Sequence, residues 1–91
     1  MRDIGHVRFA PATDDERERG LLGYVELEYG HALVLDGVAV RRTQNGRIAL
    51  VFPSRRDRQG RRHPFMRLRG EGARQQLERQ VVRALSDRGV L

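Results

Sequence analysis

The chain has 91 residues, no cysteine and a net charge of +6, with eighteen arginines and no lysine. This length is typical of one small domain, here residues 1–91, and the lack of cysteine excludes disulfides and thiolate chemistry. No apolar run approaches the roughly 18 residues of a membrane span, and the N-terminus lacks the apolar segment of a signal peptide. We therefore expect a cytoplasmic protein with no membrane partner.

The two halves of the chain differ in charge. Residues 1–40 contain four arginines and eight acidic residues, whereas residues 41–91 contain fourteen arginines and four acidic residues. A GC-rich genome explains the choice of arginine over lysine, but it does not explain this clustering. A basic half favours a polyanionic partner.

The first half of the chain has the apolar alternation of an antiparallel sheet. Strands are predicted over residues 4–10, 21–29, 32–40 and 48–52. Between the first two strands, residues 11–20 are charged, non-periodic and end in glycine, which predicts a mobile loop.

Glycines mark the turns of this predicted sheet. Gly30-His31 is expected to form a short turn, and Asp36-Gly37 a bulge within the third strand. Asn45-Gly46 predicts a type I′ hairpin turn, because this dipeptide adopts the positive φ angles that such a turn requires.

The end of the chain predicts one amphipathic helix, from Glu71 to about Ser86. Its apolar residues recur at helical spacing at Ala73, Leu77, Val81, Ala84 and Leu85. Gly89 stands where a capping glycine is expected. Strands followed by a helix indicate an α+β fold, with an antiparallel sheet of four to five strands and one C-terminal amphipathic helix. Off the apolar stripe, Val82 either joins Leu22 and the Val90-Leu91 tail in a subunit interface or is a scattered surface residue.

An arginine-rich segment follows the fourth predicted strand. Pro53 ends that strand, because proline has no N–H to donate to a sheet ladder. The predicted nucleic-acid-binding residues follow at once and are opposed only by Asp57: Ser54, Arg55, Arg56, Arg58, Arg61 and Arg62. We expect a cationic loop, with Gly60 near its tip, whose guanidinium groups pair with phosphate oxygens. The alternative is a solvated charged loop that aids solubility.

Other chemistry has less support. Ser54, Asp57 and His63 are the residue types of a hydrolytic triad, but a flexible loop gives no reason for their alignment, so no catalytic residue is predicted. The isolated histidines and the lack of cysteine indicate no metal site, and no glycine-rich fingerprint indicates a cofactor. Tyr24 and Phe65 are candidates for base stacking, but packing is favoured for both. Duplex binding is therefore preferred over single-strand recognition.

A set of motifs spans nearly the whole chain: Leu35-Asp36-Gly37-Val38-Ala39-Val40, Gly46, Val51-Phe52-Pro53-Ser54-Arg55-Arg56, Gly60, Pro64 and the C-terminal helix. Together they resemble the stage V sporulation protein G (SpoVG) family of septation proteins, most specifically in Pro-Ser followed by two basic residues. The chain departs from the family at Phe52, where methionine is usual, and in residues 67–72, which lack the expected small polar run. The resemblance implies a sheet with a C-terminal helix, dimers joined through the sheets, and regulation by binding DNA, in some members RNA. The family's basic residues carry over to Arg55 and Arg56.

These observations lead to three hypotheses. The first is a small, non-catalytic regulator that binds nucleic acid, duplex DNA before RNA, as a homodimer whose protomers share a sheet edge. The second is a protein-interaction module in cell division or septation, in which the arginines bind an acidic protein surface. The third and weakest is a small enzyme.

Overall fold

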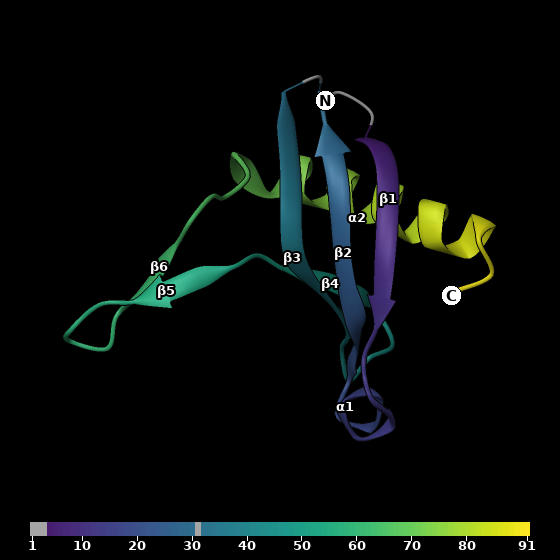
Figure 1. The fold of residues 1–91 in the computed structure, drawn as a ribbon, viewed down its shortest axis with the longest axis horizontal. Coiled ribbons are helices and arrows are strands. Elements are labelled where there is room, and N and C mark those ends of the chain that lie inside the picture. Colours follow the sequence, from purple (N-terminus) through teal and green to yellow (C-terminus); the bar gives the residue numbers. More distant parts are fainter. Residues whose placement is uncertain (1–3, 31) are drawn as a thin grey trace.

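The structure is a computed structural model that describes residues 4–30 and 32–91. Its elements are β1 (Ile4–Pro11), α1 (Asp14–Glu18), β2 (Leu21–Tyr29), β3 (Leu33–Arg42), β4 (Ile48–Val51), β5 (Ser54–Arg56), β6 (Arg62–Pro64) and α2 (Gly70–Asp87). Strands β1 to β4 form one antiparallel sheet in sequence order, and β5 pairs with β6 in a separate two-stranded sheet (Figure 1). The predicted α+β fold is thereby confirmed.

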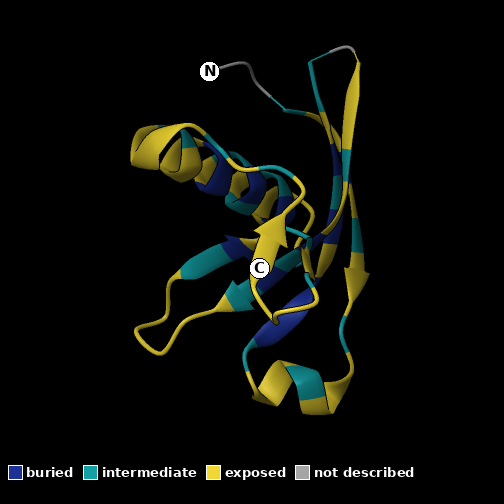
Figure 2. Cartoon of the chain, turned by 90° about the vertical axis from the view of Figure 1, so that its left-hand side faces the viewer, coloured by how far each residue is buried: buried dark blue, intermediate teal, exposed yellow. Residues whose placement is uncertain are grey.

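Helix α2 covers one face of the four-stranded sheet (Figure 2). The helix residues Leu77, Val81 and Leu85 are fully buried, and they belong to the same core cluster as Leu27 and Val40 of the sheet. The predicted apolar stripe is therefore the face that closes the core. Burial of this stripe is the main source of stability for α2, because a helix in a protein gains most of its stability from the packing of its amphipathic face.

The C-terminus of α2 is capped as the sequence predicts. Gly89 has a φ angle of 76° and donates its N–H to the Ser86 carbonyl at 3.0 Å. The N–H of Val90 then reaches the Leu85 carbonyl at 2.9 Å. This pair of bonds is the Schellman arrangement, and it turns Val90 back against the core.

The predicted bulge in β3 is confirmed. Val25 pairs with Val38, but Leu27 pairs with Leu35, so one residue of β2 faces both Asp36 and Gly37. Gly37 has a φ angle of 68°, which favours glycine.

The predicted hairpin at Asn45-Gly46 is also confirmed, but the expected type I′ turn is wrong. Gly46 has a φ angle of 83°, and no described residue other than glycine has a positive φ. The N–H of Gly46 bonds the Thr43 carbonyl at 3.0 Å, and the N–H of Thr43 bonds the Arg47 carbonyl at 2.8 Å. The connection is thus a three-residue loop, in which a turn is followed by one left-handed glycine.

Two further expectations need correction. The segment predicted as a mobile loop contains α1, because Thr13 and Glu16 form a capping box that begins the helix. Leu22 is 8 % exposed and lies in the core, and Val90 packs against that core, so these two residues do not supply the suggested subunit interface. The expected turn at Gly30-His31 falls partly outside the described residues, since His31 is not among them.

Substitution by alanine is expected to have opposite effects on stability at two glycines, Gly23 and Gly72. A Cβ atom at the buried Gly23 would collide with the Ala10 carbonyl oxygen and lie 2.6 Å from Cζ of Phe9. Gly23→Ala is therefore expected to lower the free energy of unfolding by about 1–3 kcal/mol. Thermal or urea unfolding measures the change.

The matched control is Gly72→Ala in α2, where a Cβ atom would meet open space. This variant is expected to raise the free energy of unfolding by about 0.5–1 kcal/mol, because alanine is the better helix former. A Gly23→Ala protein as stable as the parent would contradict the close packing of Phe9 over β2.

In the part of the chain that the structure describes, no helix has both the length and the apolar character needed to cross a membrane.

Candidate nucleic-acid interface

The arginine-rich segment forms a hairpin, and the prediction of a loop is wrong in this respect. We call residues 54–64, which comprise β5, its tip and β6, the arm. The arm projects from the body of the protein beyond the end of β4 (Figure 1). The Cα radius of gyration is 13.5 Å, larger than the value of about 12 Å expected for a compact chain of this length. The projecting arm accounts for the larger value.

The root of the arm is tied by backbone. Pro53 follows β4 and accepts a hydrogen bond from the N–H of Phe65 at 3.2 Å. Ser54 pairs with Pro64, Arg55 with His63, and Arg56 with Arg62.

The strand pairing sorts the basic side chains between two faces. Directly opposed residues of a hairpin share a face, and successive residues alternate between faces. Arg55 therefore lies beside His63, whereas Arg56 lies beside Arg62 on the other face. Like charges in direct opposition destabilise a hairpin by a few tenths of a kcal/mol to about 1 kcal/mol. An anion seated between Arg56 and Arg62 would relieve this repulsion.

Asp57 organises the tip of the arm. Its Oδ1 accepts the backbone N–H of Gln59 at 2.8 Å and that of Arg61 at 2.9 Å. Its Oδ2 accepts hydrogen bonds from Nε of Arg61 at 3.0 Å and from Nε2 of His63 at 2.8 Å. Because an ionised carboxylate only accepts, Nε2 of His63 carries the proton in this arrangement.

The hydrogen bond from His63, followed by that from the backbone of Arg61, lowers the pKa of Asp57 below its ordinary value of 3.8. The order of the tip therefore depends on the ionised carboxylate. Since the folded state favours this form, its contribution is complete above the ordinary pKa and is lost as the pH falls through the lowered pKa of the folded arm.

We expect the amide resonance of Arg61 to move toward that of an unstructured chain as the pH falls below about 4, because protonation of Asp57 weakens four hydrogen bonds. NMR spectra recorded from pH 6 to pH 2 measure this change. The control is Asp57→Asn, which keeps one acceptor oxygen but does not titrate. Its Arg61 resonance is expected to stay constant over the same range, and an identical titration in the two proteins would contradict the role of Asp57.

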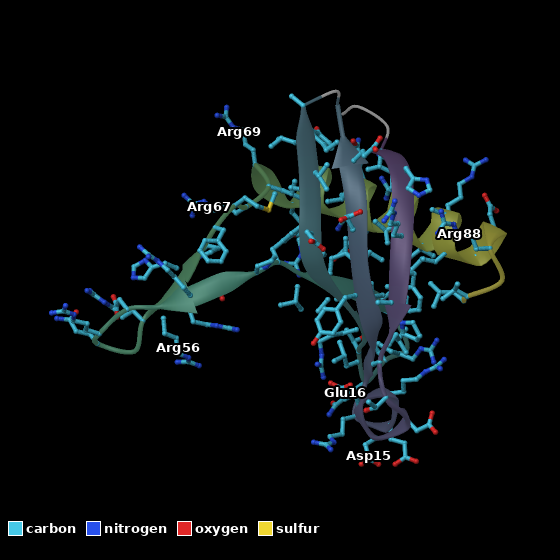
Figure 3. All side chains as sticks on the ribbon, viewed as in Figure 1. Asp15, Glu16, Arg56, Arg67, Arg69 and Arg88 are labelled. Atoms are coloured by element: carbon cyan, nitrogen blue, oxygen red, sulfur yellow. The ribbon has the colours of Figure 1, made fainter. Side chains whose placement is uncertain are left out.

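The five predicted arginines of the arm are all exposed, but they are not equivalent. Arg61 is paired with Asp57, and Nη1 of Arg56 donates to the Gly60 carbonyl at 3.1 Å. The side chains of Arg55, Arg58 and Arg62 make neither a hydrogen bond nor an ion pair with any residue in ranges 4–30 and 32–91. The acidic side chains of α1 lie at another end of the molecule (Figure 3).

Two arginines outside the predicted set extend the basic surface. Arg67 and Arg69 are exposed on the connection from β6 to α2, and they point away from the sheet on the side of the molecule from which the arm projects (Figure 3). In the sequence these two arginines alternate with the apolar Met66 and Leu68, and this alternation could have predicted that they point outward. The partly buried apolar residues of this connection turn the two arginines outward.

The structure brings together two of the three residues with triad chemistry. Asp57 and His63 are hydrogen-bonded, but Ser54 lies in β5 opposite Pro64 and makes no hydrogen bond to either of them. No group of three metal-ligating side chains occurs among residues 4–30 and 32–91. Phe65 is 67 % exposed, so the packing role expected for it is wrong. Tyr24 is also exposed, at 42 %, so the packing role expected for it has no support either.

Comparison with known proteins finds no matching family model, no similar curated protein and no similar solved structure.

Proposed function

We propose that this protein is a small, non-catalytic regulator that binds nucleic acid, with duplex DNA preferred over RNA. The observation that carries the proposal is the arm, which holds five exposed arginines and one acid beyond the end of a sheet. Guanidinium groups donate paired hydrogen bonds to phosphate oxygens, and unpaired ones such as Arg55, Arg58 and Arg62 need break no internal contact to do so.

The width of the basic surface supports a polymer as the partner. Arg67 and Arg69 continue the positive charge from the arm toward α2. A single small anion would need only one or two of these groups, whereas a phosphate backbone presents a regular row of charges. Most contacts would then be to phosphates, which position a protein without reading sequence.

A homodimer joined through sheet edges is the second part of the proposal. Strand β4 pairs only with residues 39–42 of β3, so residues 33–38 of β3 have no described strand on their outer side. This stretch exposes Leu33 and Val34, which are 57 % and 58 % exposed. A second copy paired along it would satisfy the open backbone groups and cover both side chains. Two arms would then face one duplex with twofold symmetry.

Membership in the SpoVG family, and with it a bacterial cytoplasmic role in the regulation of sporulation, septation or cell division, is part of the same proposal. Its support is the Pro53-Ser54-Arg55-Arg56 motif at the root of the arm and the agreement of the fold with the one that the resemblance implies.

The test measures solution mass by light scattering, with and without a short duplex, and affinity as a function of salt. We expect about 21 kDa for the free protein, twice the chain mass of 10.5 kDa, and a complex of two chains with one duplex. The logarithm of affinity should fall with the logarithm of salt by about 0.9 for each phosphate neutralised. Failure to bind DNA or RNA, together with protein partners that survive nuclease treatment, would favour the protein-interaction module instead.

A further inference from the structure

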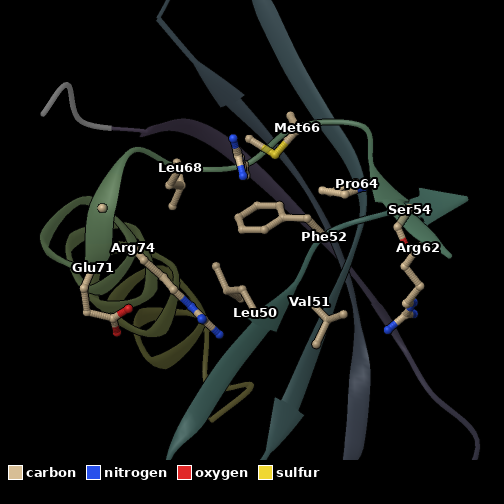
Figure 4. A pocket seen from close by; sticks show the side chains of 12 residues that line it. Leu50, Val51, Phe52, Ser54, Arg62, Pro64, Met66, Leu68, Glu71 and Arg74 are labelled. Atoms are coloured by element: carbon tan, nitrogen blue, oxygen red, sulfur yellow. The ribbon is translucent and has the colours of Figure 1, made fainter.

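A groove of about 540 Å³ lies where the arm joins the body, between the end of β4 and the start of α2. Its walls are mainly apolar and consist of Leu50, Val51, Phe52, Pro64, Met66 and Leu68. The ring of Phe52 stands in the middle of the groove, with Met66 and Leu68 around it (Figure 4). Phe52 and Met66 are only partly buried, so part of this apolar wall is open to solvent.

The polar residues of the groove are mostly basic. Arg62, Arg67 and Arg74 line it, with Glu71 as the only carboxylate among its lining residues. Arg74 is partly neutralised by the buried Glu78, whose Oε2 lies 3.4 Å from its Nε. Arg62 belongs both to the arm and to the groove, so a phosphate held on the arm would lie beside the opening.

We propose that this groove binds one unpaired nucleobase of a nucleic acid whose flanking phosphates are held by the arm. The inference rests on the proposed function and specifies the kind of site within a duplex that the protein prefers, one with a bulged or flipped nucleotide. The occupant must combine a flat apolar body with adjacent negative charge. A nucleotide has both, and a volume of about 540 Å³ lies within the range of small-ligand sites.

The contacts available to such a base are of two kinds. Phe52 is partly buried and lines the groove, so its ring is the aromatic surface available there, on which any base can stack. The hydroxyl of Ser54, which also lines the groove, makes no hydrogen bond to another described residue and is left to bond a polar edge of the base. Stacking is tolerant of sequence, so the groove would select an unpaired position rather than a particular base.

The experiment compares three duplexes of one sequence by fluorescence anisotropy at fixed salt: fully paired, with one extra unpaired adenine, and with an abasic residue at the same bulge. The phosphates are alike in the last two, and these two duplexes differ only by the presence of the base. We expect the adenine bulge to bind about tenfold more tightly than the abasic bulge, as loss of one base–aromatic contact would give.

Two variants locate the base. Phe52→Leu keeps an apolar side chain but removes the ring, and it is expected to reduce the tenfold preference to about twofold or less. Phe65→Leu removes an exposed ring that does not line the groove, and it is expected to keep the preference. Circular dichroism checks the fold of both. If Phe52→Leu unfolds, Met66→Ala, which widens the groove from the exposed connection after β6, is expected to reduce the preference instead.

Equal affinity for the adenine and abasic bulges would overturn the groove proposal while leaving phosphate binding by the arm intact. Loss of the preference in Phe65→Leu but not in Phe52→Leu would also overturn it, since the base would then stack outside the groove. Absence of binding to all three duplexes would overturn the groove proposal and the DNA-binding function together.

Discussion

Replacing Arg55 and Arg56 together by alanine is expected to weaken duplex DNA binding by about one to two orders of magnitude at 0.1 M salt. Both side chains are exposed, they lie on opposite faces of β5, and neither has a carboxylate within 4.0 Å among the described residues. Each lost phosphate contact should also lower the slope of log affinity against log salt by about 0.9. Anisotropy titrations at several salt concentrations measure both quantities.

The matched control removes the same charge elsewhere. Arg17 and Arg19 are exposed at α1, among acidic neighbours and away from the arm (Figure 1). Their double alanine variant is expected to change affinity by about twofold or less and to leave the salt slope intact, because long-range charge effects are screened within about 10 Å at 0.1 M salt. Equal losses in the two double variants would mean that net charge, and not the arm, drives binding.

Leu77→Ala is expected to lower the free energy of unfolding by about 2–5 kcal/mol. Leu77 is a fully buried residue of α2 that faces the sheet, so its truncation leaves a cavity in the core. The whole stability of a small domain is about 5–15 kcal/mol, and each kcal/mol corresponds to about 4–8 °C in the midpoint of thermal unfolding at this size. A fall of at least about 8 °C is therefore expected, measured by circular dichroism or calorimetry.

Gln76→Ala provides the control on the neighbouring, exposed position of the same helix. It is expected to change the free energy of unfolding by no more than about 0.5 kcal/mol. If both variants unfolded at the same temperature, α2 would not be packed on the sheet as described.

The parts of the fold that could be predicted are those with strong periodic signals. The apolar stripe of α2, the alternation of β2 and the glycines of the bulge and hairpin each report a local requirement that the final structure shares. Helix α1 was missed although the Thr13 to Glu16 spacing of its capping box was visible, since five charged residues show no apolar period. Strand β5 was missed for a related reason: both of its faces meet solvent, so no alternation marks it.

The candidate site could be predicted as a set of residues but not as an arrangement. The density of arginine after Pro53 indicated a cationic projection, and the exposure of all five side chains agrees with that expectation. The difference between Arg61, which is paired with Asp57, and the unpaired Arg58 depends on the shape of the tip. The groove was beyond prediction, because it is formed by residues of β4, β6 and the start of α2 that only the folded chain brings together.

The tip of the arm has the same backbone design as the β3–β4 connection. In both, the first residue bonds the fifth at 2.8–2.9 Å, and the fourth is a glycine, Gly46 or Gly60, with φ near 80°. An oxygen of Thr43 or Asp57 accepts the N–H of the arginine four positions later in each case. One of these loops is anchored by a neutral hydroxyl and the other by a carboxylate. Exchange of this carboxylate for a hydroxyl can therefore change the electrostatic potential at the end of the arm while the backbone conformation of the turn is kept.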